Sequence, residues 1–269
     1  MMVPMRAPSD AFLVAPAATT ARRPRTDGRE RIAVPFVSGI VAALLASAIG
    51  VVASLLGVLV VMVAVVLAIG RMPSAEAGHP LLTATELIFY GCAGAFAWHR
   101  LQKLRPGTLR VPNRQAMVVI AIGVAALLLT RVLLAMQLVF TRQTNHVQAG
   151  FEHYSIVTHD VLVTDVNVAL SLFSLVLLGP FVEEVVFRGL LFGALASKLG
   201  VFAGALLSAA IFGALHGDPV LFAWLAAVGL VNAFAYAATG NLTVPIVLHA
   251  LSNALGASVL LETSLHAMR

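Results

Sequence analysis

The sequence contains little charge and almost no cysteine. Of its 269 residues, 11% are charged and 60% are hydrophobic, and the mean hydropathy is +0.96. A soluble globular domain usually has about 25% charged and about 45–50% apolar residues, so that class is excluded. The single cysteine, Cys92, excludes a disulfide scaffold, and the apolar excess excludes an intrinsically disordered chain. The composition that remains is typical of a polytopic membrane protein.

Basic residues are concentrated in the N-terminal part of the chain. The net charge is +5, and 12 of the 17 Lys and Arg residues lie at or before Arg114. Basic clusters beside apolar spans are orientation signals, because Lys and Arg resist translocation across the bilayer. No basic stripe with interleaved aromatic residues is present, so we expect no nucleic-acid partner. The N-terminal tail and the loop His99–Arg114 are both expected on the cytoplasmic side.

Composition divides the chain into four segments. Residues 1–35 are rich in Pro, Ala, Thr and Arg, and we interpret them as a disordered, basic, cytoplasmic tail and not as a signal peptide. Residues 36–165 form N-terminal membrane spans and loops, which end in a polar segment expected outside. Residues 166–261 form a second membrane domain, and residues 262–269 a C-terminal tail. The polar segment contains three histidines, His146, His153 and His159, whose spacing does not place them on one helix face.

The apolar run Ile32–Gly70 leaves two topologies open. At about 1.5 Å per residue, a helix of this length reaches roughly twice the hydrocarbon core of about 30 Å. Length therefore favours a hairpin bent near Gly50 or Gly57. The charge pattern favours one long tilted helix instead. The tail and the loop His99–Arg114 share a side and Thr83–Trp98 supplies one crossing, so the run should supply an odd number.

The remaining apolar segments predict an all-α, polytopic transmembrane helical bundle of about seven or eight membrane helices. Gly179-Pro180 is expected to break the chain between two of them, because proline lacks the helical donor and clashes with the preceding turn. Broken or re-entrant helices are expected around the polar motifs described next. The segments run from Arg114 to about Phe140 and over residues 166–178, 181–197, 201–215, 219–238 and 242–261.

Three polar clusters lie in the apolar C-terminal part, where one ionisable residue costs about 2.5–3.5 kcal/mol at the centre of a span. They are Glu183-Glu184-Val-Val-Phe-Arg188, Phe212-Gly-Ala-Leu-His216 and His249-Ala-Leu-Ser-Asn253. A single His or Asn in a span is more often an interhelical hydrogen-bond partner than a catalytic group. Several carboxylates and imidazoles within 70 residues are harder to explain in that way. Together they are the side chains that activate water.

Helical geometry separates the two adjacent glutamates. Residues four apart share a helix face, so Glu184 is expected to form an ion pair with Arg188 that neutralises both charges. Glu183 lies about 100° further round the helix and is left without that partner. It is therefore expected to face a polar cavity.

The order EExxxR, FxxxH and HxxxN resembles the CPBP family of intramembrane proteases. That family contains the type II CAAX prenyl endopeptidases and bacterial bacteriocin-processing or immunity proteins. The resemblance covers roughly residues 166–261, with all three motifs in the expected order and membrane context, and it marks this segment as the catalytic membrane domain. The first 165 residues match only in being membrane-spanning.

The resemblance implies a role for each matched position. Glu183 would be the general base and would activate the attacking water together with His216. His249 and Asn253 would stabilise the oxyanion of the tetrahedral intermediate. The positions expected to give structural support are Glu184, Arg188 and Phe212.

The cofactor and the substrate stay open at this point. Glu183, His216 and His249 are also a ligand set that could hold a divalent metal such as zinc with an open fourth position. The resemblance implies a membrane-associated protein or peptide as the substrate, either prenylated or bacteriocin-like, cleaved within the lipid bilayer. We expect a multi-pass protein of a bacterial plasma membrane with a cytoplasmic N-terminus.

Two other functions are alternatives. In a proton-coupled transporter, buried Glu and His residues form a relay, but paired repeats with interrupted helices in both halves would then be expected. A non-catalytic scaffold or immunity protein would not need the intact motifs. A shared site also has a geometric requirement, because His216 and His249 must lie within about 10 Å of each other to act on one water.

Overall fold

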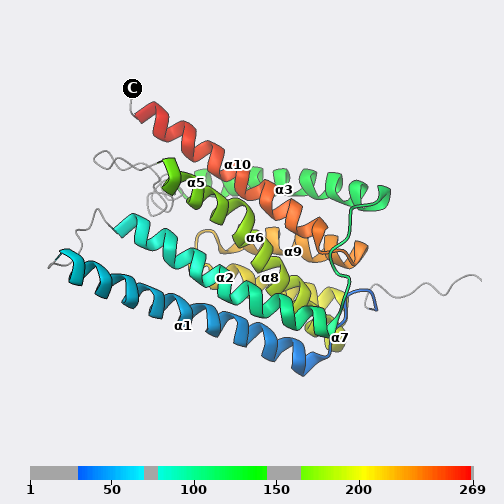
Figure 1. Ribbon diagram of the computed structural model, residues 1–269. Coiled ribbons are helices and arrows are strands. Elements are labelled where there is room, and N and C mark those ends of the chain that lie inside the picture. The colour runs from blue at the N-terminus through cyan, green and yellow to red at the C-terminus, as the bar shows by residue number, and fades with distance from the viewer. Residues whose placement is uncertain (1–29, 70–77, 144–164, 268–269) are drawn as a thin grey trace, which may run out of the picture.

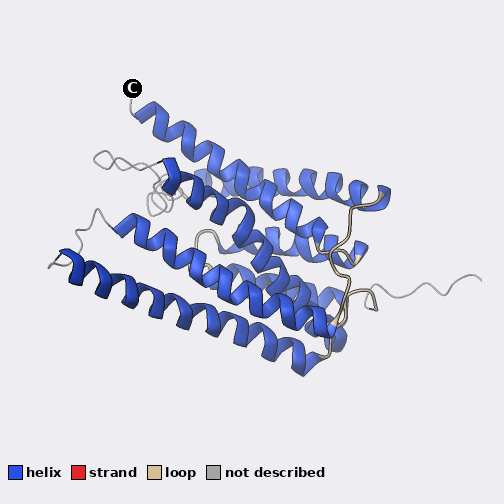
Figure 2. Ribbon diagram, in the orientation of Figure 1, coloured by secondary structure: helices blue, strands red, loops and turns tan. Residues whose placement is uncertain are grey.

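The computed structural model describes residues 30–69, 78–143 and 165–267, and this part of the chain is helices and short loops without a strand (Figures 1 and 2). The predicted tail over residues 1–29 and the three histidines of the polar segment lie outside the described residues. The all-α bundle predicted from the sequence is confirmed. Within the described ranges, four helical segments are long and apolar enough to cross a membrane, and a fifth apolar helix is shorter.

The N-terminal run is a single helix. Helix α1 extends over Phe36–Ile69 without a break at Gly50 or Gly57, so the run is one long helix, as the charge pattern favoured, and not a hairpin. It packs along α2 (Gly78–Leu104), as Figure 1 shows in blue and cyan. Both glycines permit this approach, because a Cβ at Gly50 would lie 2.8 Å from the ring of Phe89.

Helix α3 (Arg114–Phe140) follows the basic loop and matches the predicted span. Its first turn is capped by the side chain of Asn113, which accepts a hydrogen bond from the backbone N–H of Ala116. The loop before it is fixed to the start of the last helix. The backbone N–H of Leu242 donates to the carbonyl oxygen of Thr108 at 2.8 Å. The side-chain amide of Asn241 accepts a hydrogen bond from the backbone N–H of Arg110 and donates one to its carbonyl oxygen.

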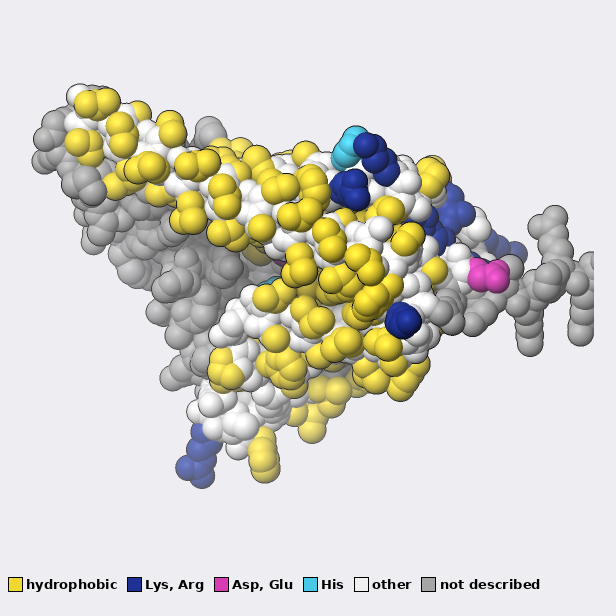
Figure 3. All heavy atoms as spheres, turned by 90° about the horizontal axis from the view of Figure 1, so that it is seen from below, with side chains coloured by type: hydrophobic (Ala, Val, Ile, Leu, Met, Phe, Trp, Pro, Cys, Tyr) yellow, Lys and Arg dark blue, Asp and Glu magenta, His cyan; other side chains and the backbone are white. Residues whose placement is uncertain are grey.

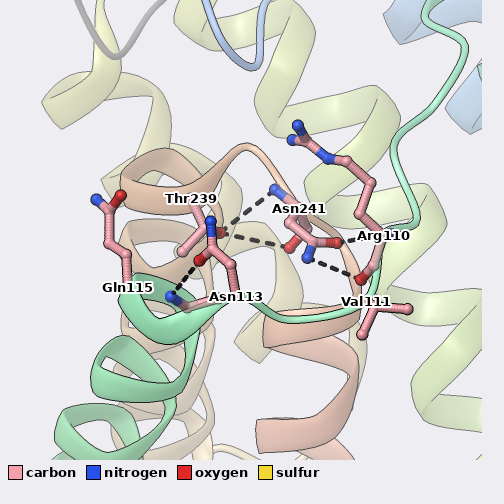
Figure 4. Close-up of a pocket in the computed structure, with 7 residues that line it drawn as sticks. Arg110, Val111, Asn113, Gln115, Thr239 and Asn241 are labelled. Carbon is pink, nitrogen blue, oxygen red and sulfur yellow. Dashed lines mark hydrogen bonds between the residues drawn. The ribbon is translucent and has the colours of Figure 1, made fainter.

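A small pocket lies at this junction, with a volume of about 80 Å³. Figure 4 shows Asn241 pointing toward Arg110 and Thr239, while Asn113 caps α3 beside them. The polar groups that line the pocket are therefore largely engaged in joining the loop to the bundle. Most of the basic side chains visible in Figure 3 lie toward this end of the molecule, and hydrophobic side chains cover much of the described surface in that view.

Residues 165–199 form one continuous helical segment, which corrects the predicted break at Gly179-Pro180. Helix α5 (Asp165–Phe173) passes into a π-helical turn, Ser174–Leu178, and then into α6 (Gly179–Glu184). The N–H of Gly179 reaches back to the carbonyl of Ser174, five residues earlier. The wider turn accommodates the proline at the first positions of α6, so the chain continues where a regular α-helix would lose a bond.

A second π-helical stretch, Val185–Phe192, leads into α7 (Gly193–Leu199). The bundle is completed by α8 (Val201–Leu215), α9 (Phe222–Thr239) and α10 (Thr243–Ala267). Helices α8 and α9 pack against each other. In Figure 2 the loop between them turns back well before the far ends of α1, α2 and α10. The loop between α8 and α9 therefore lies level with the middle of the longer helices.

Candidate active site

Glu184 is the centre of a buried polar network. Its side chain is fully buried, and one carboxylate oxygen lies 3.1 Å from Nε of Arg188, so the predicted ion pair is present. The other oxygen accepts hydrogen bonds from Nδ1 of His249 at 2.8 Å and from the amide of Asn232 at 3.1 Å. Arg188 also donates to the carbonyl of Gly229 at 3.2 Å. This one carboxylate therefore holds α6, α9 and α10 together.

Glu183 lies beside this network and is differently placed. Its side chain is 19% exposed, and its Oε1 accepts a hydrogen bond from the hydroxyl of Tyr90 at 2.8 Å. Its other oxygen lies 3.8 Å from Nε2 of His249. This separation exceeds a direct hydrogen bond and is one at which a bridging water is to be considered. As the sequence predicted, Glu183 is not paired with Arg188.

The ring of Phe212 contacts both histidines. This ring is buried, with its centroid 4.6 Å from the ring of His216 and 5.7 Å from that of His249. The guanidinium of Arg188 lies 4.6 Å from the same ring, and Phe187 meets it edge-on at 5.1 Å. The aromatic position of the FxxxH motif is therefore the spacer between the motifs.

His216 ends α8 and folds back on its own helix. Its Nδ1 lies 2.7 Å from the carbonyl oxygen of Phe212, so Nδ1 carries the proton in this bond and Nε2 is left as an acceptor. Unlike His249, His216 is exposed. The early turn between α8 and α9 allows both imidazoles to contact Phe212, although one histidine ends its helix and the other lies near the start of α10.

Two sequence predictions remain, the position of Asn253 and the set of possible metal ligands. The Asn253 amide donates to the carbonyl of Leu175 in the first π-helical turn at 2.9 Å, which leaves its second N–H and its oxygen for other partners. Among the residues that the structure describes, no three His, Cys, Asp or Glu side chains are grouped closely enough to hold a metal ion. Glu183, His216 and His249 do not form such a group, and a metal at these positions stays a prediction.

Two residues of the network were missed by the sequence analysis. Tyr90 and Asn232 lie on α2 and α9, outside the three motifs, and no spacing along the chain links them to Glu183 or Glu184. The one feature of the sequence that could have pointed to them is a polar side chain in an apolar span, and a single Tyr or Asn there is weak evidence for a site. Glu86 carries a stronger signal as an acidic residue one helical turn before Tyr90. Its carboxylate accepts a hydrogen bond from Ser174 at 3.4 Å.

Comparisons with known proteins match the segment of the chain that contains the three motifs. The model of a family described as Rce1-like, the type II CAAX prenyl endopeptidases, matches residues 165–255. The "Putative membrane peptidase YdiL" of Bacillus subtilis (strain 168) is 40% identical over 77 residues. That alignment covers 29% of this chain and 32% of YdiL, so the similarity spans about a third of the relative. No solved structure matches the chain significantly.

Proposed function

The segment 165–255 belongs to the CPBP family, which contains the type II CAAX prenyl endopeptidases, and on this premise we propose that the protein is an intramembrane endopeptidase. It would hydrolyse a peptide bond of a membrane-associated protein or peptide. The observation that carries the proposal is the contrast between the two adjacent glutamates. Glu184 is fully buried and paired with Arg188, whereas Glu183 is partly exposed and directed toward His249.

Glu183 fits the role of the general base. Its carboxylate is free of Arg188 and held by Tyr90, and its second oxygen lies 3.8 Å from Nε2 of His249, so a water beside the two atoms could bond to both. Glu183 takes a proton from this water, and the hydroxide oxygen forms a bond to the carbonyl carbon of the substrate. The carbonyl π electrons move to the oxygen, which becomes the oxyanion of a tetrahedral intermediate.

The two histidines suit different steps. His249 gives its Nδ1–H to Glu184, and a protonated His249 also has Nε2–H available for the oxyanion. The second N–H of Asn253 supplies another donor. His216 keeps Nε2 as an acceptor, because its Nδ1–H is engaged by Phe212. It can accept a hydrogen bond from the attacking water. The proton held by Glu183 then passes to the leaving amine as the oxyanion re-forms the carbonyl and the carbon–nitrogen bond breaks.

A metal-assisted route would use the same side chains differently. A zinc ion would polarise the substrate carbonyl and lower the pKa of the attacking water. The described geometry does not gather its three candidate ligands, so every step above is assigned to the chain's own residues. We propose a plasma membrane location and a lipid-anchored or apolar peptide substrate of prenylated or bacteriocin-like type.

The test is cleavage of a fluorogenic peptide panel by the purified protein in detergent, with lipidated peptides included. Wild type is compared with Glu183→Gln and His216→Ala, each with and without chelator. Glu86→Gln is the matched control, because it also removes a carboxylate from a membrane helix but contacts Ser174 and neither histidine.

We expect cleavage by the wild type and by Glu86→Gln, and a loss of at least a hundredfold in the other two variants. Activity that survives both Glu183→Gln and His216→Ala would refute the site. Loss of activity on chelation would favour the metal over the glutamate-activated water. No cleavage of any peptide by the wild type would favour the scaffold alternative.

A further inference from the structure

An arginine lies inside the third membrane helix and has no role in the proposed mechanism. Arg131 is nine residues before the end of α3 at Phe140, which places its Cα about 14 Å from that end. Ionisable residues at such depth are rare, and they usually mark a substrate or ion site or pair with an opposite charge. Among the described residues, Arg131 forms no ion pair with a carboxylate.

The Arg131 side chain points into the bundle. Its terminal nitrogen Nη2 donates to the backbone carbonyl of Ser252 on α10, and its guanidinium carbon lies 5.5 Å from the ring centroid of Trp224 on α9. A long basic side chain near a membrane surface usually extends outward to the lipid headgroups. Arg131 instead lies between three helices and is half-buried, with its Nε shielded from solvent.

Two buried N–H donors at this contact lack an acceptor. Nε of Arg131 and Nε1 of Trp224 are both shielded from solvent and make no hydrogen bond with the described residues. Buried donors without an acceptor are uncommon in folded proteins, because each loses its hydration without compensation. A cation and an indole N–H in one contact can both be satisfied by an anionic oxygen.

This contact adjoins the candidate active site. Ser252, which receives the Arg131 hydrogen bond, precedes Asn253 and lies one helical turn after His249 on α10. Helix α3 also reaches the loop after His216, because the Gln137 amide donates to the carbonyl of Val220 at 2.9 Å. A ligand at Arg131 and Trp224 would therefore lie alongside residues that act on the scissile bond.

We infer that Arg131 and Trp224 bind a carboxylate of the peptide substrate and thereby position it at the site. This inference rests on the proposed function and adds a substrate class, a peptide with an acidic group near the cleaved bond. The carboxylate is either the C-terminal one or that of a nearby Asp or Glu. The depth and inward direction of Arg131 favour an anion carried by an apolar peptide over the phosphate of a lipid headgroup, which stays at the membrane surface.

The first experiment compares matched peptides that differ only in charge. One pair has a C-terminal acid or amide, and a second pair has Glu or Gln near the cleaved bond. The enzyme forms are wild type, Arg131→Gln and Trp224→Phe, with Arg114→Gln as a control that removes an exposed arginine from the start of the same helix. Trp224→Phe keeps the aromatic ring and removes the N–H.

The wild type and Arg114→Gln are expected to show a KM at least tenfold lower for the acidic member of one pair. In Arg131→Gln and Trp224→Phe this ratio should fall toward one, because the KM of the acidic peptide rises. The pair that responds identifies the carboxylate. An equal ratio in all four proteins would overturn the inference, since a merely structural role would change activity on both members alike.

A binding experiment separates this inference from the proposed function. The chain has two tryptophans, so Trp224 is the only one left in a Trp98→Phe background, and Glu183→Gln prevents turnover. The Trp224 fluorescence is titrated with N-acetylated apolar tripeptides as acids and amides, and in bilayers with phosphatidylglycerol or phosphatidylcholine.

Saturation by the acid at a concentration at least tenfold below that of the amide supports the carboxylate site, even if the wild type cleaves nothing. A response to phosphatidylglycerol alone would assign the site to lipid phosphate and overturn the inference. Equal responses to acid and amide would also overturn it. Thermal melts of Arg131→Gln and Arg131→Lys show whether each variant is folded, and Trp224→Phe gives an independent result if neither is.

Discussion

Nδ1 of His249 lies 2.8 Å from the carboxylate of Glu184, so the first and third sequence motifs are joined by a direct hydrogen bond. The same carboxylate pairs with Arg188 at 3.1 Å. Glu184 therefore does more than fix the rotation of its own helix. It orients the His249 imidazole so that Nε2 faces Glu183, much as a carboxylate behind a histidine sets the orientation and tautomer of that histidine in other sites.

Glu184→Gln should lower both stability and activity. Removing one partner of a buried ion pair leaves the other charge uncompensated, and this costs about 3–5 kcal/mol. The readouts are the thermal melting midpoint in detergent and peptide cleavage. Arg188→Met should destabilise by a similar amount, while the double variant should be more stable than either single variant because no lone charge remains. A double variant less stable than both would contradict the pairing.

Tyr90→Phe should lower cleavage without unfolding the protein. The change removes the hydroxyl that donates to Glu183 at 2.8 Å, while the ring and its edge-on contact with Phe89 are kept. We expect roughly a tenfold loss in kcat, smaller than the loss of the base itself, because the hydroxyl positions Glu183 and does not take the proton from water. A melting midpoint more than a few degrees lower, with proportional loss of activity, would indicate a structural role instead.

Two glycines on α2 form a matched pair for packing at the site. A Cβ at Gly94 would lie 2.6 Å from Val182, the residue before Glu183, whereas a Cβ at Gly91 would meet nothing within 4 Å. Gly94→Ala should therefore reduce the melting midpoint and the activity. Gly91→Ala should be neutral or slightly stabilising, because alanine favours the helix by about 0.8–1 kcal/mol over glycine. Equal melting curves for the two variants would show that α2 does not pack tightly against the helical turn that carries Glu183.

The ends of α3 should face opposite sides of the membrane, with the basic loop inside. In a Cys92→Ser background, Val111→Cys and Gln143→Cys place one exposed thiol before and one after the helix. A membrane-impermeant maleimide added to intact cells should label Gln143→Cys alone and label Val111→Cys only after lysis. The reverse pattern would invert the proposed topology.

The helices could largely be predicted from apolar length and charge, since a span depends on local composition. The predicted bounds 201–215 and Arg114–Phe140 agree with α8 and α3. The prediction of a break at Gly179-Pro180 was wrong, because a π-helical turn precedes Pro180 and the helix continues although proline lacks the N–H donor. Such a turn depends on contacts with neighbouring helices, and no residue pattern in the chain specifies it.

The contacts of the candidate site could likewise be predicted only in part. The pairing of Glu184 with Arg188 follows from a spacing of four on one helix, so the sequence was sufficient. The bond between Glu184 and His249 joins residues 65 positions apart and depends on how α6 and α10 pack. Tyr90 and Arg131 were missed for that reason, because their partners lie on other helices.

The two π-helical stretches also restrict how this segment can change in length. A π turn closes a bond between residues five apart, where an α-helix uses four, so each stretch accommodates residues that a regular helix would have no place for. Deleting one residue within a π-helical stretch would restore a regular helix and leave the residues beyond it facing much as before, whereas deleting one residue from a regular α-helical turn would rotate everything beyond it by about 100°. A deletion of the second kind in α6, before Glu183, would turn the two carboxylates away from the histidines although both glutamates were kept. The number of residues in this segment is therefore as important to the site as their identity.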